Sequence, residues 1–455
     1  MKTASVASGI YGRIAGIGRP LLLILLIGLV IRLILMPLFS FSFDMSAWVV
    51  PGIGFEGGRN LYDTSYFMYT PLYGYILSIM TGIGNLIGIS IPGEMMSDLV
   101  SSTGASTILT TMITTISANI LYKVPLLIID IITAWVLYRI VNHLTNDNKK
   151  ATIAFALWFL CPLVIWSSSV ACMFDSLSAL FSLLCFFFLI KERYVFSGMA
   201  FMLAVTTKVF PMCLIFVILV YMIAKHRKEI QTMLKNLGQF IISAVAVFAV
   251  VYAPVIWTGN LSKSFIFFSA RSDEVINSSF NPLYILTHIS YNQIIQFAPL
   301  VIMALIYIAW RMYNSKSEKR DQNMVIAMLL SFTVMFIWPS TPTYSVILIP
   351  FLAMAITVCE KKTLIWSWAL FSSIMVLEAL STFNFQVLYS VAAYTDLFDL
   401  NSIISLVVNN GGIFNILVGI FKYLEFLPGI SVLAIFYLEK KKKTEMKGLE
   451  GCIHE

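Results

Sequence analysis

Long apolar runs separated by short polar segments fill almost the whole chain. Most runs are close to the length of about 20 residues that a helix needs to cross a bilayer's hydrocarbon core of about 30 Å. The pattern therefore predicts an all-α polytopic membrane protein with roughly 10–13 transmembrane segments. The runs lie near 20–39, 71–91, 119–141, 151–169, 174–190, 195–224, 237–257, 292–311, 323–338, 343–359, 363–381 and 412–437.

The short segments between these runs are basic, and short basic loops of membrane proteins stay in the cytoplasm. Lys149, Lys191, Lys316 and Lys440 each lie in such a segment. Placing all of them in the cytoplasm predicts that both termini are cytoplasmic. The outer segments are then 40–118, 170–174, 258–291, 339–342 and 382–411.

Two of the runs do not fit this rule as single crossings. If run 71–91 crossed the membrane once, Lys149 would lie outside. We therefore expect this run to lie in the interface, or to dip into the membrane and return, within the first outer loop, 40–118. Run 195–224 has basic segments at both ends and is too long for one span, so we expect a broken or re-entrant helix pair. The predicted organisation is one transmembrane domain over 1–438 and a basic cytoplasmic tail over 439–455.

Composition narrows the class of protein. Only 12% of residues are charged and the mean hydropathy is +0.87, whereas soluble domains carry about 25% charged residues. The net charge of +7 would suit nucleic acid, but the positive residues lie in loops between spans, so we expect no nucleic-acid partner. The six cysteines form no metal-binding or disulfide pattern. The basic residues before run 20–39 predict a retained signal-anchor helix.

Candidate chemistry gathers in the first outer loop. Asp44 follows the first run directly and can be read as an exposed acid that ends a helix, or as a general base whose pKa is raised by partial desolvation at the membrane surface. The candidate substrate-binding residues that follow it are Glu56, Arg59, Tyr62, Asp63 and Tyr69.

Four more charged residues lie inside or at the ends of apolar runs. Asp175 is read either as the cap of the following helix or as a ligand contact. Lys208 precedes the break at Pro211, and an ammonium in so apolar a setting needs a carboxylate or an anion. Asp130 is the partner we expect for Lys208 if the pair is structural. Arg32 can snorkel outward or hold a lipid phosphate.

Four motifs, taken in order, resemble a known family. They are GRNLYDTSYFMYTPLYGY at 58–75, LYKVP with Asp130 and YR at 121–139, LWFLCPLVIWSSS with FDSL at 157–177, and KVFP at 208–211. Together they resemble the enzyme of the endoplasmic reticulum that adds the first mannose to glycosylphosphatidylinositol (GPI). This enzyme belongs to the GT-C superfamily of polyprenyl-phosphate-sugar-dependent glycosyltransferases.

The resemblance implies a GT-C-like fold and an inverting sugar transfer on the outer or lumenal face. The donor would be a mannose-like hexose or a pentose on polyprenyl or dolichyl phosphate, and the acceptor a lipid-linked glycan, glycolipid or protein. Asp44 would be the base, with Lys208 or Arg32 on the donor phosphate. The family carries an Asp-x-Asp pair where this chain has Ser42-Phe43-Asp44, which leaves a divalent cation, Mg²⁺ or Mn²⁺, open.

The resemblance also sets the expected location and the alternatives. We expect the plasma membrane of a prokaryote, or the endoplasmic reticulum membrane if the protein is eukaryotic, with membrane lipid around it and a small membrane subunit as an open question. A transporter or lipid flippase is the main alternative, although internal repeats are not evident in the sequence. A non-catalytic subunit that keeps the fold is the third.

Overall fold

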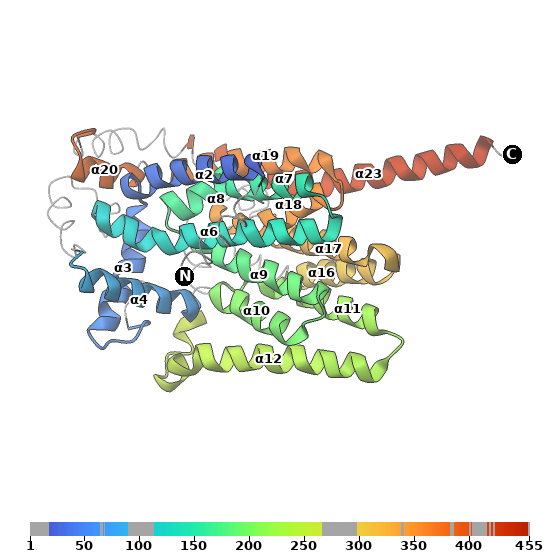
Figure 1. The fold of residues 1–455 in the computed structure, drawn as a ribbon, viewed down its shortest axis with the longest axis horizontal. Coiled ribbons are helices and arrows are strands. Elements are labelled where there is room, and N and C mark those ends of the chain that lie inside the picture. The colour runs from blue at the N-terminus through green and yellow to red at the C-terminus, as the bar shows by residue number, and fades with distance from the viewer. Residues whose placement is uncertain are drawn as a thin grey trace, which may run out of the picture.

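The computed structural model is a bundle of helices whose long members run in about the same direction. It describes residues 18–63, 67, 69–89, 113–265, 298–337, 341–382, 386–399 and 424–453, with a few isolated residues between the last two ranges. Helices α2 (Arg19–Leu38), α6 (Ile116–Thr145) and α12 (Ile230–Trp257) run along the long axis of the molecule (Figure 1). These three are long and apolar enough to cross a membrane by length and composition. The all-α polytopic prediction is confirmed.

Shorter apolar helices complete the bundle. Helices α7 (Asn148–Phe159), α8 (Pro162–Ile165) and the π-helical turn η1 (Trp166–Val170) form one run that bends by 46°. Pro162 explains the bend, because proline cannot donate the backbone hydrogen bond that a continuous helix needs. The other members are α9 (Asp175–Ile190), α16 (Ala298–Tyr313), α17 (Arg320–Met335), η6 (Pro342–Leu348) with α18 (Ile349–Thr357), and α19 (Ile365–Thr382).

Run 195–224 forms a hairpin of two helices. Helix α10 (Tyr194–Thr207) ends before Lys208, the 3₁₀ turn η2 (Phe210–Leu214) follows, and α11 (Ile215–His226) returns. Tyr194 Oη and His226 Nε2 lie 2.6 Å apart, so the two ends of the hairpin meet. Lys208 and Pro211 therefore lie at its far tip.

The two ends of the bundle differ. Helices α3 (Ser42–Glu56), α4 (Pro71–Leu86) and α20 (Tyr389–Tyr394) gather at one end (Figure 1). The α6–α7, α11–α12 and α16–α17 turns, which carry many of the basic residues, lie at the opposite end (Figure 1). Helix α4 is 16 residues long, or about 24 Å at 1.5 Å per residue, and packs on α3.

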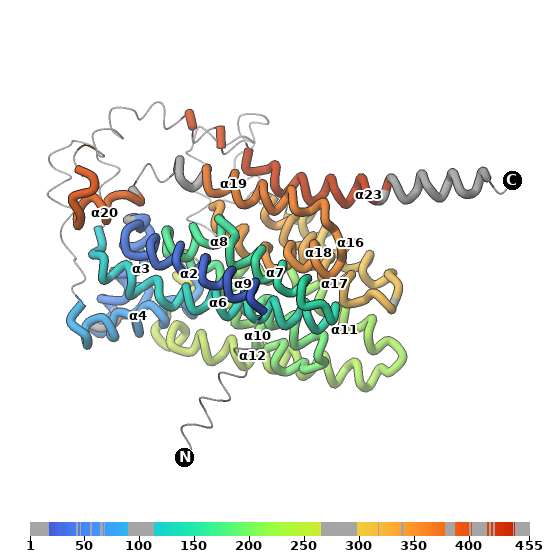
Figure 2. Tube along the Cα trace, turned by 45° about the horizontal axis from the view of Figure 1, so that its top comes forward, coloured from blue at the N-terminus to red at the C-terminus, as the bar shows by residue number. Residues whose placement is uncertain are grey.

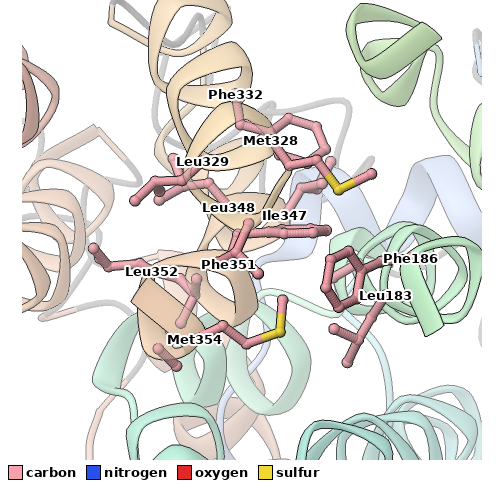
Figure 3. Close-up of a cluster of buried hydrophobic side chains, with 14 of the residues drawn as sticks. Leu183, Phe186, Met328, Leu329, Phe332, Ile347, Leu348, Phe351, Leu352 and Met354 are labelled. Carbon is pink, nitrogen blue, oxygen red and sulfur yellow. The ribbon is translucent and has the colours of Figure 1, made fainter. Parts of the chain in front are cut away.

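The core lies where α9, α17 and η6–α18 meet. Phe186 and Leu183 of α9 face Met328 and Phe332 of α17 and the η6–α18 residues, among them Phe351 (Figure 3). Nearly every side chain from Pro342 to Thr357 is buried, so this segment is surrounded by other helices, whereas α2 exposes many large apolar side chains on its outer face.

The C-terminal run ends later than the sequence pattern predicts. Helix α23 (Phe426–Ile453) packs beside α19 and continues through the basic segment (Figures 1 and 2). Lysine and glutamate are good helix formers, so charge alone does not end a helix. The remaining 3₁₀ turns are η3 (Lys263–Phe265), η5 (Ser317–Lys319), η7 (Lys362–Leu364) and η8 (Gln386–Leu388).

Candidate functional site

Helix α6 holds the end of α2, just before Asp44. The last carbonyl groups of a helix have no partner within it, and here side chains of α6 supply donors. Lys123 Nζ donates to Met36 O at 3.2 Å and also to Phe39 O. Asn119 Nδ2 donates to Pro37 O at 3.2 Å. These contacts fix the turn from which α3 begins.

Asp44 lies in the first turn of α3, and its side chain is only 7% exposed. A carboxylate is favoured there because the N-terminal end of a helix carries partial positive charge. The description of Asp44 as an exposed acid at the end of a helix is therefore wrong: it starts a helix and is buried. Its use as a base stays a prediction.

Trp48, one turn after Asp44, is the centre of an aromatic cluster. Its ring lies 5.4 Å from that of Tyr69 and 5.3 Å from that of Phe174, measured between centroids. Tyr73 of α4 stacks on Phe174 at 4.1 Å. The first outer loop is thus packed directly against the segment that leads into α9.

Lys208 and Asp175 form a buried ion pair beside this cluster. Lys208 Nζ lies 2.6 Å from Asp175 Oδ1, and the side chains are 2% and 0% exposed. The ammonium also lies over three ring faces, 4.3 Å from Tyr344, 4.7 Å from Phe174 and 5.4 Å from Tyr69. Such contacts are attractive because the face of an aromatic ring is electron-rich. We call the five residues of this paragraph the Lys208 cage.

The structure corrects the expected partner of Lys208. Asp130 pairs with Arg32, not with Lys208: Arg32 Nη2 lies 3.1 Å from Asp130 Oδ2, and both side chains are fully buried. The spacing of charges along the sequence does not reveal which helix faces meet, and the bundle brings α2 against α6. Ser168 Oγ also donates to Asp130 Oδ2 at 2.7 Å.

Arg32 has further partners that hold it inside the bundle. Its Nη1 donates to Phe159 O at 2.8 Å, and its guanidinium lies 4.2 Å from the centroid of the Phe159 ring. An arginine with no exposed surface and these partners does not snorkel outward, so that alternative is wrong. Arg32 therefore has a structural role and links α2, α6 and α7.

The other predicted site residues lie in two different settings. Tyr62 and Tyr69 are buried, and Tyr62 Oη donates to Tyr69 O at 2.7 Å; burial raises the pKa of the Tyr62 hydroxyl well above its ordinary value. Arg59 and Asp63 are exposed, and Asp63 Oδ2 accepts from the Asn60 backbone N–H at 2.8 Å. The side chain of Glu56 lies outside what the structure describes.

Sequence reasoning missed several residues of the site. Trp48, Phe174 and Tyr344 read as ordinary aromatic residues of a hydrophobic chain, and only the packing shows that they surround one ion pair. The adjacency of Phe174 to Asp175 was the one available signal. In the described part of the chain, no group of three or more His, Cys, Asp or Glu side chains could hold a metal ion.

One comparison with known proteins gives a match. Residues 53–277 match the family model described as "GPI transamidase subunit PIG-U", which is just under half of the chain. The matched range contains Asp175 and Lys208, while Arg32 and Asp44 precede it. No curated protein matches the chain significantly. The chain is thus an integral membrane protein with partial similarity to a family named for GPI transamidase.

Proposed function

We propose that this protein is a membrane glycosyltransferase that takes a sugar from a polyprenyl-phosphate donor. The observation that carries the proposal is the Lys208 cage, which packs against the helix that bears Asp44. Burying two charges costs several kcal/mol per ion before their attraction is counted. Ionisable groups retained inside a membrane bundle commonly serve function, so a buried pair that packs against the helix of a third carboxylate is a candidate active site.

The cage suits the phosphate of the donor. An ammonium has three N–H donors, and one of them reaches Asp175 Oδ1, so Lys208 can serve a phosphate oxygen as well. The surrounding rings exclude water, and a lower local dielectric strengthens the attraction between Lys208 and the charge that develops on the leaving phosphate. Arg32 has no exposed surface and is paired with Asp130, so the proposal assigns the phosphate to Lys208.

Asp44 supplies the base in this proposal. Its carboxylate takes the proton of the acceptor hydroxyl while that oxygen attacks the anomeric carbon of the sugar. The bond from this carbon to the phosphate oxygen breaks, its electron pair stays on the polyprenyl phosphate, and the configuration inverts. Trp48 on the same helix faces the cage, so Asp44 and Lys208 belong to one packed unit. The donor would be a mannose-like hexose or a pentose, and the acceptor a lipid-linked glycan, glycolipid or protein on the outer face.

The family match favours a second candidate function. PIG-U is described as a GPI transamidase subunit, and the matched range does not reach Asp44. A chain that kept the cage for packing alone would act as a membrane subunit of a GPI-related complex without transferring sugar. The two candidates differ in whether Asp44 has to lose and gain a proton.

The test uses the purified full chain and radiolabelled polyprenyl-phosphate mannose, glucose and pentose donors. We expect label transfer to membrane-lipid acceptors, and we expect Asp44→Asn to lower it by about 100-fold while donor binding is retained. Asp396→Asn, an exposed outer carboxylate, is the matched control and should stay near the native rate. Equal rates in Asp44→Asn and native protein would remove Asp44 as base. If no donor gives transfer and other membrane subunits co-purify, the second candidate, a membrane subunit that transfers no sugar, is favoured.

A further inference from the structure

An apolar groove runs between α10 and α12 on the outside of the bundle. Its volume is about 770 Å³, within the range of about 300–1,000 Å³ that small-molecule sites occupy. Val195, Met199 and Leu203 form one wall at a spacing of four residues, which is one face of α10. The facing wall is a stripe of α12 that runs from Leu234 to Val251.

Two glycines show that this groove is not a failure of packing. At Gly198 of α10 an added Cβ would lie 2.2 Å from Phe240 O, so that glycine lets the two helices touch. At Gly238 of α12 no described atom lies within 4 Å of an added Cβ, and its backbone is helical. Neither close packing nor conformation requires a glycine at 238, although glycine costs a helix about 1 kcal/mol relative to alanine. Because no described side chain fills the space beside Gly238, a molecule outside the protein can occupy it.

The polar residues of the groove lie toward one end. Lys235 and Gln239 line it beside Gly238, near the start of α12, where the basic α11–α12 turn predicts the cytoplasmic surface. Arg193, exposed, directly precedes α10 at the same end of that helix. From Ile242 to Val251 the lining is apolar apart from Ser243. This part is about 14 Å long at 1.5 Å per residue, close to half of a bilayer core of about 30 Å.

We propose that this groove binds one anionic diacyl phospholipid of the cytoplasmic leaflet. The phosphate lies at Lys235 and Gln239, Gly238 makes room for the glycerol region, and an acyl chain follows the Ile242–Val251 stripe against α10. Charge complementarity selects an anionic headgroup, and the length of the apolar part matches one leaflet. The lipid fills the space between α10 and α12, and α10 ends directly before Lys208.

The test compares lipid retention by the full chain in native mass spectrometry. Delipidated protein is incubated with equal amounts of phosphatidylglycerol and phosphatidylcholine, and the lipids that remain bound are counted. We expect phosphatidylglycerol to be retained preferentially. We expect Lys235→Glu to lower its retention by about tenfold or more, and Gly238→Leu to abolish it by filling the groove.

Two matched controls change charge or apolar volume outside the groove lining. Lys228→Glu changes the charge in the α11–α12 turn without touching the groove, and Ala249→Leu adds apolar volume to an exposed position of α12 outside it. Both should retain lipid. Thermal unfolding checks the fold of each variant, and Lys235→Glu, at an exposed position, provides a test if Gly238→Leu fails to fold.

Three outcomes would overturn the proposal. Equal retention of both phospholipids, unchanged by Lys235→Glu, would mean that the groove holds only ordinary surrounding lipid. Unaltered retention in a folded Gly238→Leu variant would locate the lipid elsewhere. Displacement of phosphatidylglycerol from the native protein by an equal amount of a polyprenyl phosphate would assign the groove to the chain of a donor.

Discussion

Lys208 and Arg32 carry the same charge inside the same bundle, yet their surroundings differ. Arg32 meets a carboxylate, a backbone carbonyl and a ring, all within hydrogen-bonding or stacking distance. Lys208 meets one carboxylate oxygen and three ring faces. Rings do not use up hydrogen-bond donors, so Lys208 keeps N–H groups for an anion at the face of the first outer loop, whereas Arg32 links α2, α6 and α7. This difference underlies the assignment of the phosphate to Lys208.

The first prediction separates a functional from a structural role of the Lys208–Asp175 pair. Lys208→Met alone leaves a buried carboxylate without its ammonium, which should lower stability by about 3–5 kcal/mol. The double variant Lys208→Met/Asp175→Leu removes both charges and should recover much of the thermal stability, yet remain inactive in sugar transfer. Lys208→Arg should keep part of the activity. A stable double variant with the native rate would show that the pair only supports the fold.

A second prediction concerns Arg32 and Asp130. Either Arg32→Leu or Asp130→Leu should destabilise the protein by about 3–5 kcal/mol, because one buried charge then lacks its partner. The double variant should unfold close to the native temperature and still transfer sugar. Thermal unfolding and label transfer measure the two effects separately. Loss of donor binding in a stable double variant would indicate that Arg32 binds the donor phosphate.

At the scale of elements, breaks in helices determine where the charged groups lie. The run through α7 and η1 bends at Pro162, the hairpin of α10 and α11 turns at Lys208–Pro211, and η6 precedes α18. Each break interrupts an apolar run toward the end of the bundle where α3 and α4 lie. The turns bring Lys208 over the ring of Tyr69 in the first outer loop, and Tyr344 against Lys208, without a long soluble loop.

A third prediction tests how α10 is held against α12. In Gly198→Leu the new side chain would meet Phe240 O, a backbone atom that cannot turn aside. Overpacking of this kind costs about 1–3 kcal/mol or more, so thermal stability and expression should fall, and sugar transfer should fall with the displacement of Lys208. Gly238→Leu on the facing helix is the size-matched control and should fold normally. Equal unfolding temperatures for both variants would contradict this account of the contact.

At the scale of the whole molecule, the bundle is asymmetric from end to end. Helices α3 and α4 lie toward one end, and the basic turns lie at the other (Figure 1). The Lys208 cage packs against α3 and α4 through Trp48 and Tyr73. Positively charged segments are retained on the cytoplasmic side during insertion. The same arrangement therefore predicts that the proposed active site faces outward, toward the lumen or the exterior.

A fourth prediction tests this orientation by labelling single cysteines with an impermeant maleimide. In a Cys452→Ser background, Asp63→Cys should react in intact cells and Lys149→Cys only after permeabilisation. The other five cysteines are buried or partly buried and serve as the background signal. Cytoplasmic labelling at Asp63→Cys would contradict the prediction that residues 40–118 lie on the outer side. The same result at Ser101→Cys, a position that the structure does not describe, would also contradict it.

The sequence by itself determined the helices and the candidate charges. Apolar runs of membrane-spanning length leave the backbone few alternatives, because its polar groups must be satisfied within the helix. Ionisable residues in or beside such runs are conspicuous because a charge in the membrane is costly. Asp44, Asp175, Lys208 and Arg32 could therefore be singled out without a structure. The partners of these charges could not be deduced. Only the tertiary structure decided that Lys208 meets Asp175, that Arg32 meets Asp130, and that Trp48 and Tyr344 surround the site, because a helical period fixes which residues share a face but not which faces meet.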